Sequence, residues 1–313
     1  MLKHRLLMSA LLIPATIGLF AWDHYLGDRA PVLFILMLLL SARCVWEFVT
    51  LVRAAGYRPQ SALVLSGTWL MITAAWWPHL LSHQWPLRFF DEPLAYIAGA
   101  LGVVVVVLLL NAVLRFPSLQ RATETASAAP RPGHQVATLG IELFAVGYIG
   151  GLLALTCQLR WMGYRSDYEG YGYFPLSALV IVTKMGDVGA YTFGRLIGGP
   201  KMTPKLSPGK TISGGIGHLL TAGLSAVAWM VWLGPIIVLT LPSAGWRVGP
   251  AFVFGIAVGF AGLIGDLAES LIKRDVGVKD APALLPGFGG LLDLMDSLLL
   301  AGPVAYAMWF FLR

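Results

Sequence analysis

The stretch AFVFGIAVGFAGLIGDLAESLIKRDVGVKD, residues 251–280, joins a long apolar run to a dense group of charges. Its part 265–280 holds seven charged side chains in sixteen residues, although only 12% of the whole chain is charged. The apolar part is long enough to cross a bilayer as a helix, which takes roughly 17–25 residues. The stretch therefore predicts a membrane-spanning helix that carries a cluster of charged side chains at one end.

The composition extends this prediction to the whole chain. The 313 residues are 57% hydrophobic, and the mean hydropathy is +0.74, whereas about 25% of a soluble domain is charged. Two cysteines, Cys44 and Cys157, lie in apolar runs and are expected to be free, buried thiols. We expect an all-α, polytopic helix bundle with about nine transmembrane helices, near residues 6–22, 31–52, 61–81, 94–114, 136–159, 175–198, 218–241, 250–272 and 291–312.

The ends of the chain and its basic residues predict an orientation. The first apolar run begins with the basic segment MLKHR but ends in GLFAWD, which offers no good small-residue cleavage site, so we expect a retained helix. With the N-terminus inside, the cytoplasmic segments hold 14 Lys and Arg residues and the opposite segments hold 6. Because basic residues accumulate on the cytoplasmic side, we expect a cytoplasmic N-terminus and cytoplasmic loops at 199–217 and 273–290.

The polar segment 115–135 predicts a division of the chain. It is rich in Ser, Ala, Thr and Pro and reads as a flexible cytoplasmic linker between a four-helix membrane region, 1–114, and a five-helix catalytic membrane region, 136–313. In the first region, Arg43 and Glu47 are four residues apart and are expected to pair. In the second, GIAVG at 255–259 allows close helix packing, either within the bundle or in a dimer.

Four polar residues of the quoted stretch share one helical face. Asp266, Glu269, Ser270 and Lys273 are spaced i, i+3, i+4 and i+7. A charge at the bilayer centre costs about 2.5–3.5 kcal/mol on insertion scales, so such a face should line a protein interior or a wet cavity. The plainer alternative is a membrane-edge ion pair of Asp266 or Glu269 with Lys273.

A second polar face follows after a short loop. Asp293, Asp296 and Ser297 are spaced i, i+3 and i+4 near the start of the last apolar run. Neighbouring helices would bring Asp266 towards Asp293, and carboxylates that meet without a cation repel each other. Carboxylate and hydroxyl oxygens suit Mg²⁺, which takes one or two carboxylates together with phosphate oxygens. The two faces therefore predict a magnesium site.

A third polar segment, KMGDVGAYTFGRLIGGPKMTPKLSPGKTISGGIG at 184–217, combines glycines with cations. Asp187 lies in mid-span beside Gly186, and Lys205 and Lys210 follow in a Gly- and Pro-rich loop. Backbone N–H groups and cations together make an anion site, while the alternative is a loop that binds lipid headgroups. Acids for a metal and cations for phosphate indicate metal-assisted phosphoryl or nucleotidyl transfer on a membrane-embedded substrate.

At these residues the chain resembles the phosphatidate cytidylyltransferase (CDP-diacylglycerol synthase) family. The family signature S-x-x-K-R-x(4)-K-D and then P-G-H-G-G-x-x-D-R-x-D is matched by Ser270 to Asp280 and by PGFGGLLDLMD, 286–296. The family stretch A-D-x-G-A-Y and then S-P-G-K-T is matched by GDVGAY and SPGKT. The chain departs from the family at Phe288 (usually His), at Leu294 (usually Arg) and at Ile212 and Ser213 (usually Trp-Glu).

The resemblance implies an enzyme that converts phosphatidate and CTP into CDP-diacylglycerol and pyrophosphate in phospholipid biosynthesis. It implies Mg²⁺ as cofactor, with a second, monovalent cation left open, and CTP, phosphatidate and membrane lipids as partners, with no nucleic acid and a homodimer left open. It implies a location in the cytoplasmic membrane, with the site facing the cytoplasm. The alternatives are a CTP-dependent polyprenol or phytol kinase and a non-catalytic lipid-binding protein of the same fold.

The resemblance also implies roles for individual residues. Asp266 and Asp293 would hold the metal, with Asp296 as a weaker candidate, and Lys273 and Lys279 would act with them in catalysis. The expected substrate-binding residues are Asp187, Lys205, Ser207, Lys210, Thr211, Ser270, Arg274, Asp280 and Ser297. Phe288 is expected to pack its loop against the bundle.

Overall fold

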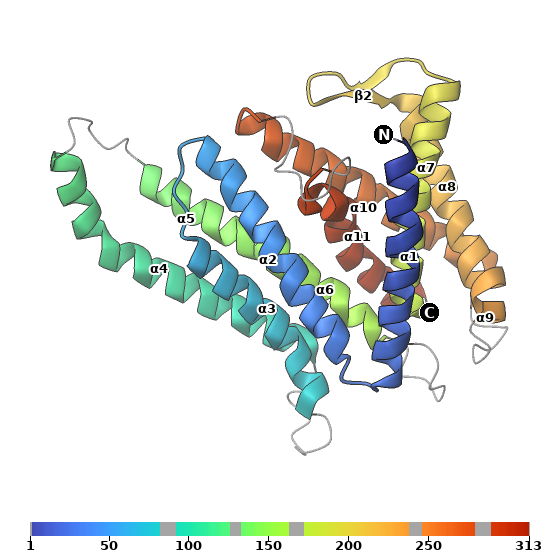
Figure 1. Ribbon diagram of the computed structural model, residues 1–313, viewed down its shortest axis with the longest axis horizontal. Helices are drawn as coiled ribbons and strands as arrows, with labels where there is room; N and C mark the ends of the chain where they lie inside the picture. Colours follow the sequence, from blue (N-terminus) through green and yellow to red (C-terminus); the bar gives the residue numbers. More distant parts are fainter. Residues whose placement is uncertain are drawn as a thin grey trace. The chain divides into compact units, whose positions relative to one another are not determined.

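The computed structural model describes residues 2–81, 92–125, 133–162, 172–237, 246–278 and 289–312, which form helices and one short β-hairpin (Figure 1). In chain order the elements are α1 (Leu2–Tyr25), α2 (Pro31–Ala54), α3 (Ser61–Leu81), α4 (Pro93–Thr125), α5 (His134–Ala145), the π-helix η2 (Val146–Gly151), α6 (Leu152–Cys157), the 3₁₀ helix η3 (Gln158–Arg160), α7 (Phe174–Leu196), β1 (Lys201–Thr203), β2 (Ser207–Thr211), α8 (Ile212–Val227), the π-helix η4 (Ala228–Leu233), α9 (Gly234–Ile237), α10 (Val248–Asp275) and α11 (Leu291–Leu312).

The helices coincide with the predicted apolar runs. Each run, in its described part, overlaps one helix or a series of consecutive helical segments. Within the described residues, six stretches are long and apolar enough to cross a membrane: Pro31–Ala54, Pro93–Phe116, His134–Arg160, Ile212–Ile236, Val248–Asp275 and Leu291–Leu312. The protein is therefore a helical integral membrane protein, as predicted, while the number of nine crossings and the cytoplasmic N-terminus stay predictions.

The β-hairpin is the one departure from the predicted all-α fold in the described part of the chain. Gly198 and Gly199, with φ of 66° and 101°, end α7 in a backbone conformation that side chains with a Cβ rarely adopt. β1 then pairs antiparallel with β2, with Lys201 opposite Thr211. Strands of three and five residues are too short to leave a hydrophobic period in the sequence, so only the glycines and prolines indicated a shaped loop.

The chain forms two compact units. Unit 1 consists of Met1–Leu33, Leu155–Asp275 and Lys279–Arg313, and unit 2 consists of Phe34–Ala154 and Val276–Val278. The predicted division at 115–135 is a different one and stays a prediction. Of that segment, 115–125 continue α4, and 126–132 lie outside the described residues.

In unit 1, α8 packs against α7 and α10, and α10 packs against α11. Glycines make the close approaches possible. A Cβ added to Gly255 of α10 would lie 2.5 Å from the carbonyl oxygen of Ala222 on α8, and one added to Gly265 would lie 2.4 Å from that of Asp296 on α11. The stretch GIAVG at 255–259 thus serves packing within the bundle.

In unit 2, α3 packs against α4 and η2, and α4 packs against α5. The predicted pair of Arg43 and Glu47 is confirmed, with 2.8 Å between Nε and Oε1, and the Glu47 side chain is fully buried. Glu142 of α5 accepts a hydrogen bond of 2.8 Å from the backbone N–H of Gln60, directly before α3. Cys44 in this unit and Cys157 in unit 1 are buried thiols outside any disulfide, as predicted.

Candidate active site

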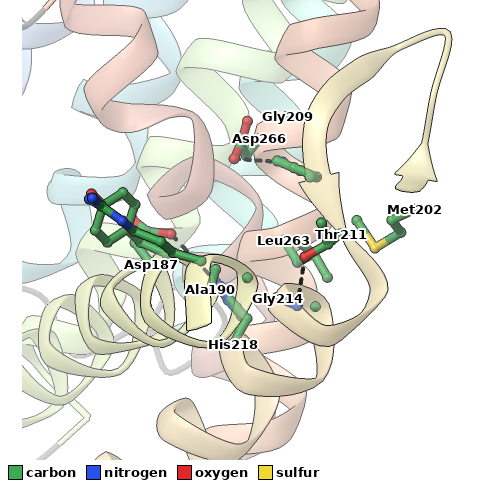
Figure 2. Close-up of a pocket in the computed structure, with 14 residues that line it drawn as sticks. Asp187, Ala190, Met202, Gly209, Thr211, Gly214, His218, Leu263 and Asp266 are labelled. Carbon is green, nitrogen blue, oxygen red and sulfur yellow. Dashed lines mark hydrogen bonds and ion pairs between the residues drawn. The ribbon is translucent and has the colours of Figure 1, made fainter. Parts of the chain in front are cut away.

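A pocket of about 530 Å³ in unit 1 brings together three motifs from the sequence (Figure 2). It lies where α7, the β-hairpin, the start of α8 and α10 meet, and four of its polar lining residues were predicted as site residues. The lining residues are Asp187, Ala190, Tyr191, Gly194, Arg195, Met202, Gly209, Lys210, Thr211, Gly214, Gly215, His218, Leu263 and Asp266. The SPGKT loop and the two acids therefore share one site.

The hairpin delivers Lys210 to the pocket. Lys210 Nζ lies 2.6 Å from Asp266 Oδ2 of α10, and the Asp266 side chain is 38% exposed. The next residue, Thr211, caps α8: its Oγ1 accepts a hydrogen bond of 3.1 Å from the N–H of Gly214 (Figure 2). Gly214 and Gly215 in the first turn of α8 line the pocket, so the positive end of this helix dipole lies at the site and favours an anion.

Asp187 enters the pocket from α7 and contacts two further residues. Its Oδ2 accepts a hydrogen bond of 3.2 Å from Lys184 Nζ, and its Oδ1 lies 3.8 Å from Nδ1 of His218 on α8 (Figure 2). His218 is 2% exposed, and its Nε2 lies 2.9 Å from the carbonyl oxygen of Gly259. A Cβ on Gly186 would lie 2.7 Å from His218 Nε2, so the glycine before Asp187 makes room for the ring.

A second polar cluster lies between α10 and α11, and we name Glu269, Lys273, Asp293, Asp296 and Ser297 the α10–α11 cluster. Lys273 Nζ donates to Asp293 Oδ1 at 2.8 Å and lies 3.3 Å from Glu269 Oε2. The N–H of Gly290 donates to Asp293 Oδ2 at 3.1 Å. Asp296 is buried, and its Oδ1 accepts hydrogen bonds from both the backbone N–H and the hydroxyl of Ser297.

The alternative of a simple ion pair with Lys273 holds for Glu269 and not for Asp266. Glu269 pairs with Lys273, as that alternative expects. Asp266, by contrast, reaches across to Lys210 on the hairpin. The polar face of α10 therefore divides: Asp266 faces the pocket, and Glu269 and Lys273 belong to the α10–α11 cluster.

The other predicted site residues that the structure describes lie on the hairpin and on α10. Lys205 is exposed in the turn of the hairpin, and Ser207 begins β2. Arg274 Nε lies 3.5 Å from the carbonyl oxygen of Leu206, which ties the end of α10 to the hairpin, and Ser270 is half-buried on α10. Lys279, Asp280 and Phe288 lie outside the described residues.

Sequence reasoning left three polar residues out of the site. His218 belongs to no motif. The only signal in the sequence was a single histidine in an apolar helix close to glycines, whose missing side chains leave space for its ring. Glu269 shares the face of Asp266 and Lys273 and is only 2% exposed, which spacing alone does not reveal. Lys184 stood out only as a charge within a predicted span.

The fold and the pocket define a helical integral membrane protein with a charge-lined site in its C-terminal half. The model of the cytidylyltransferase family matches residues 3–312 of the chain, and the protein belongs to this family.

Individual relatives match part of the chain. The phosphatidate cytidylyltransferase of Brucella suis biovar 1 (strain 1330) is 39% identical over 161 residues, which are 51% of this chain and 53% of that protein. That of Haemophilus influenzae (strain ATCC 51907 / DSM 11121 / KW20 / Rd) is 36% identical over 169 residues, 54% and 57% of the two chains. The uncharacterized protein YnbB of Escherichia coli (strain K12) is 38% identical over 128 residues, 41% and 40% of the two chains. The chain thus spans about half the length of the curated relatives it matches.

Proposed function

We propose that this protein transfers the cytidylyl group of CTP to phosphatidate and releases CDP-diacylglycerol and pyrophosphate. The observation that carries the proposal is the ion pair of Lys210 and Asp266 in one pocket with Asp187. These residues belong to the motifs that the chain shares with phosphatidate cytidylyltransferases, and relatives of that name match the chain. A membrane protein with a charge-lined pocket suits a reaction between a polar nucleotide and a lipid.

In the proposed reaction, a phosphate oxygen of phosphatidate attacks the α-phosphorus of CTP. A new P–O bond forms, the bond from the α-phosphorus to the oxygen bridging to the β-phosphate breaks, and pyrophosphate leaves with the electron pair. A phosphate monoester is already largely ionised near neutral pH, since its second pKa is about 6, so the attack needs little help from a base. The residues of the site would then act by positioning the two phosphates and by neutralising their charge.

The cations of the pocket and of the hairpin fit this task. Lys210 and the positive end of the α8 dipole would hold phosphate oxygens of CTP. Lys273 in the α10–α11 cluster and Arg274 beside the hairpin would add positive charge around the reacting groups. Lys205 and Lys279 complete this set in the proposal.

The carboxylates fit a magnesium ion that is bound partly by the protein and partly by phosphate oxygens of the substrates. Among the described residues, no three His, Cys, Asp or Glu side chains lie close enough to hold a metal ion by themselves. Mg²⁺ usually takes only one or two protein carboxylates and fills its other positions with water and phosphate oxygens. Asp266 and Asp293 would hold it, with Asp296 less suited because it is only 5% exposed. When bound, the ion would neutralise charge on the phosphate oxygens.

The test uses the purified full chain with phosphatidate, labelled CTP and Mg²⁺. Formation of CDP-lipid together with pyrophosphate supports the proposal. Release of CDP together with a phosphorylated polyprenol or phytol would instead assign a lipid kinase. Lipid binding without any turnover of CTP would assign a non-catalytic lipid-binding protein, and either of these results would refute the cytidylyl transfer.

The proposal includes an orientation: an inner-membrane protein with a cytoplasmic N-terminus and the pocket open to cytoplasmic CTP. The supporting observation is the excess of Lys and Arg in the segments placed inside. Single cysteines near Lys205 and near Tyr168, in a variant without Cys44 and Cys157, would be treated with an impermeant thiol reagent in intact cells. We expect labelling near Tyr168 and none near Lys205, and the reverse pattern would contradict the orientation.

A further inference from the structure

A lysine in the middle of α7 contacts the residue at which this chain lacks an arginine. Lys184 Nζ lies 3.5 Å from the backbone carbonyl oxygen of Leu294 in the first turn of α11. The signature to which the chain conforms at Asp293 usually has Arg directly after this aspartate, and here the residue is Leu294. The Lys184 ammonium group thus lies beside the backbone of position 294, although it comes from a different helix, 110 residues away in the sequence.

The contacts of Lys184 leave part of its side chain open. Lys184 lies on α7, within the apolar run 175–198, and its side chain is 39% exposed although Asp187 pairs with it. A charged side chain within an apolar run marks a functional site by default. The open part of the ammonium group can therefore bind a ligand.

We propose that Lys184 binds a substrate phosphate and takes the place of the cation that the signature has at position 294. The inference rests on the function proposed above and names one more of its binding residues. Lys184 is held next to both parts of the site, because Asp187 lines the pocket and Leu294 follows Asp293 of the α10–α11 cluster. An ammonium group has three donors, and Asp187 and Leu294 take two, which leaves the third for a phosphate oxygen.

The geometry explains why the two positions are interchangeable. Both α7 and α11 belong to unit 1, and they pack against each other. A long side chain at 294 starts at the backbone that Lys184 already touches, so its guanidinium group can reach the space around the Lys184 ammonium. A second full charge there would repel the first. One cation at this place, from either helix, is thus the arrangement that the packing favours.

The test compares five variants of the full chain: Lys184→Met, Lys184→Arg, Leu294→Arg, the double variant Lys184→Met/Leu294→Arg, and Val188→Met. Val188 is the matched control, because it is exposed on α7 one turn after Lys184 and carries no charge. Thermal melting in detergent first establishes that each variant folds. The kcat/KM values for phosphatidate and for CTP are then measured separately with Mg²⁺ present.

We expect Lys184→Met to lower kcat/KM by about 10- to 100-fold, as the loss of a charge-assisted hydrogen bond would. Lys184→Arg should retain activity within about threefold, and Val188→Met should match the wild type. Leu294→Arg should restore at least half of the loss, on a logarithmic scale, in the double variant while giving no gain on its own. A rise in KM for phosphatidate alone identifies the lipid phosphate as the ligand, and a rise for CTP alone identifies the triphosphate.

Two results would overturn the inference. One is a folded Lys184→Met variant with wild-type kcat/KM for both substrates, and the other is a double variant as impaired as Lys184→Met. If the wild type itself makes no CDP-lipid, the proposed function fails. The inference is then decided by binding of phosphatidate in mixed micelles and of CTP, which Lys184→Met must weaken for at least one of the two and Val188→Met must not.

Discussion

The two units of this protein use the polar groups on their helices and hairpin in different ways. In unit 2, Arg43 pairs with Glu47 on the same helix, and Glu142 binds a backbone N–H just before α3. In unit 1, Asp187, Lys210 and Asp266 come from three different elements and line one pocket. A polar group in an apolar helix thus indicates a site when its partners come from distant segments and it faces a cavity. A polar group that pairs within its own helix, or that binds a backbone group at the end of another helix, indicates a structural role.

The largest effect should follow from Asp293→Asn, which removes a charge from the α10–α11 cluster without changing its shape. Asp293 holds Lys273 at 2.8 Å and is a proposed metal ligand. Because outer residues of metal sites already cost 10- to 100-fold when replaced, we expect a loss of more than about 100-fold in CDP-lipid formation. The measurement is turnover per folded molecule over a range of Mg²⁺ concentrations.

The controls for this prediction are Asp266→Asn and the double variant Asp266→Asn/Asp293→Asn. Asp266→Asn should lower CDP-lipid formation about as much as Asp293→Asn. The double variant should be little worse than either, because residues that act as one unit have non-additive effects. Near-normal turnover of folded Asp293→Asn at limiting Mg²⁺ would remove Asp293 from the metal site. Fully multiplied losses in the double variant would show two independent sites.

The next largest effect should come from Glu269→Gln. Glu269 is 2% exposed and its Oε2 lies 3.3 Å from the Lys273 ammonium, so its carboxyl group helps to hold that lysine towards Asp293. Glutamine keeps the volume and replaces one carboxyl oxygen with an amide NH₂ group, and we expect kcat to fall by about 10- to 100-fold, as for other residues that orient a ligand, with little change in KM. The KM and kcat values of Glu269→Gln, compared with those of the control Leu271→Ala at an exposed position of the same turn, check this. A change in melting temperature with unaltered kcat would mean that Glu269 only stabilises the helix pair.

Much of this arrangement follows from the sequence, for identifiable reasons. Apolar runs of about twenty residues predicted the helices, since a bilayer requires that length. The i, i+3, i+4 spacing placed Asp266 beside Glu269 and Lys273, and Asp293 beside Asp296, because helical geometry fixes a face. The pair of Arg43 and Glu47 followed from the same geometry and is confirmed.

Contacts between distant segments could not be predicted in the same way. That Lys210 meets Asp266 depends on a hairpin whose strands are too short to show a period. That His218 meets Asp187 depends on glycines at 186 and 259, which allow the helices to approach. Spacing describes one helix at a time, so the division of the α10 face between the pocket and the α10–α11 cluster appears only in three dimensions.

Glycine substitutions test whether close packing supports the site or only the fold. Gly255→Ala in unit 1 places a Cβ 2.5 Å from the Ala222 carbonyl oxygen, and Gly150→Ala in unit 2 places one 2.9 Å from the Thr68 Cα. Overpacking typically costs about 1–3 kcal/mol, so both should melt at a lower temperature. Only Gly255→Ala should also lower turnover per folded molecule. It pushes α8 away from α10, and both helices carry residues that line the pocket. Gly249→Ala, with nothing within 4 Å, is the matched control and should melt no lower than the wild type.

The smallest effect on activity should come from the Arg43 and Glu47 pair. Removing one partner of a buried pair costs about 3–5 kcal/mol. The Arg43 side chain is 25% exposed, so the loss of stability in Arg43→Met should lie at or below the lower end of that range. Arg43→Met leaves the fully buried Glu47 carboxylate without its guanidinium, so this variant should melt at a lower temperature. The double variant Arg43→Met/Glu47→Gln should melt closer to the wild type, since it also removes the buried carboxylate charge. Turnover per folded molecule should stay within about twofold of the wild type in both variants. A larger loss in the double variant would show that unit 2 takes part in the reaction, contrary to this prediction.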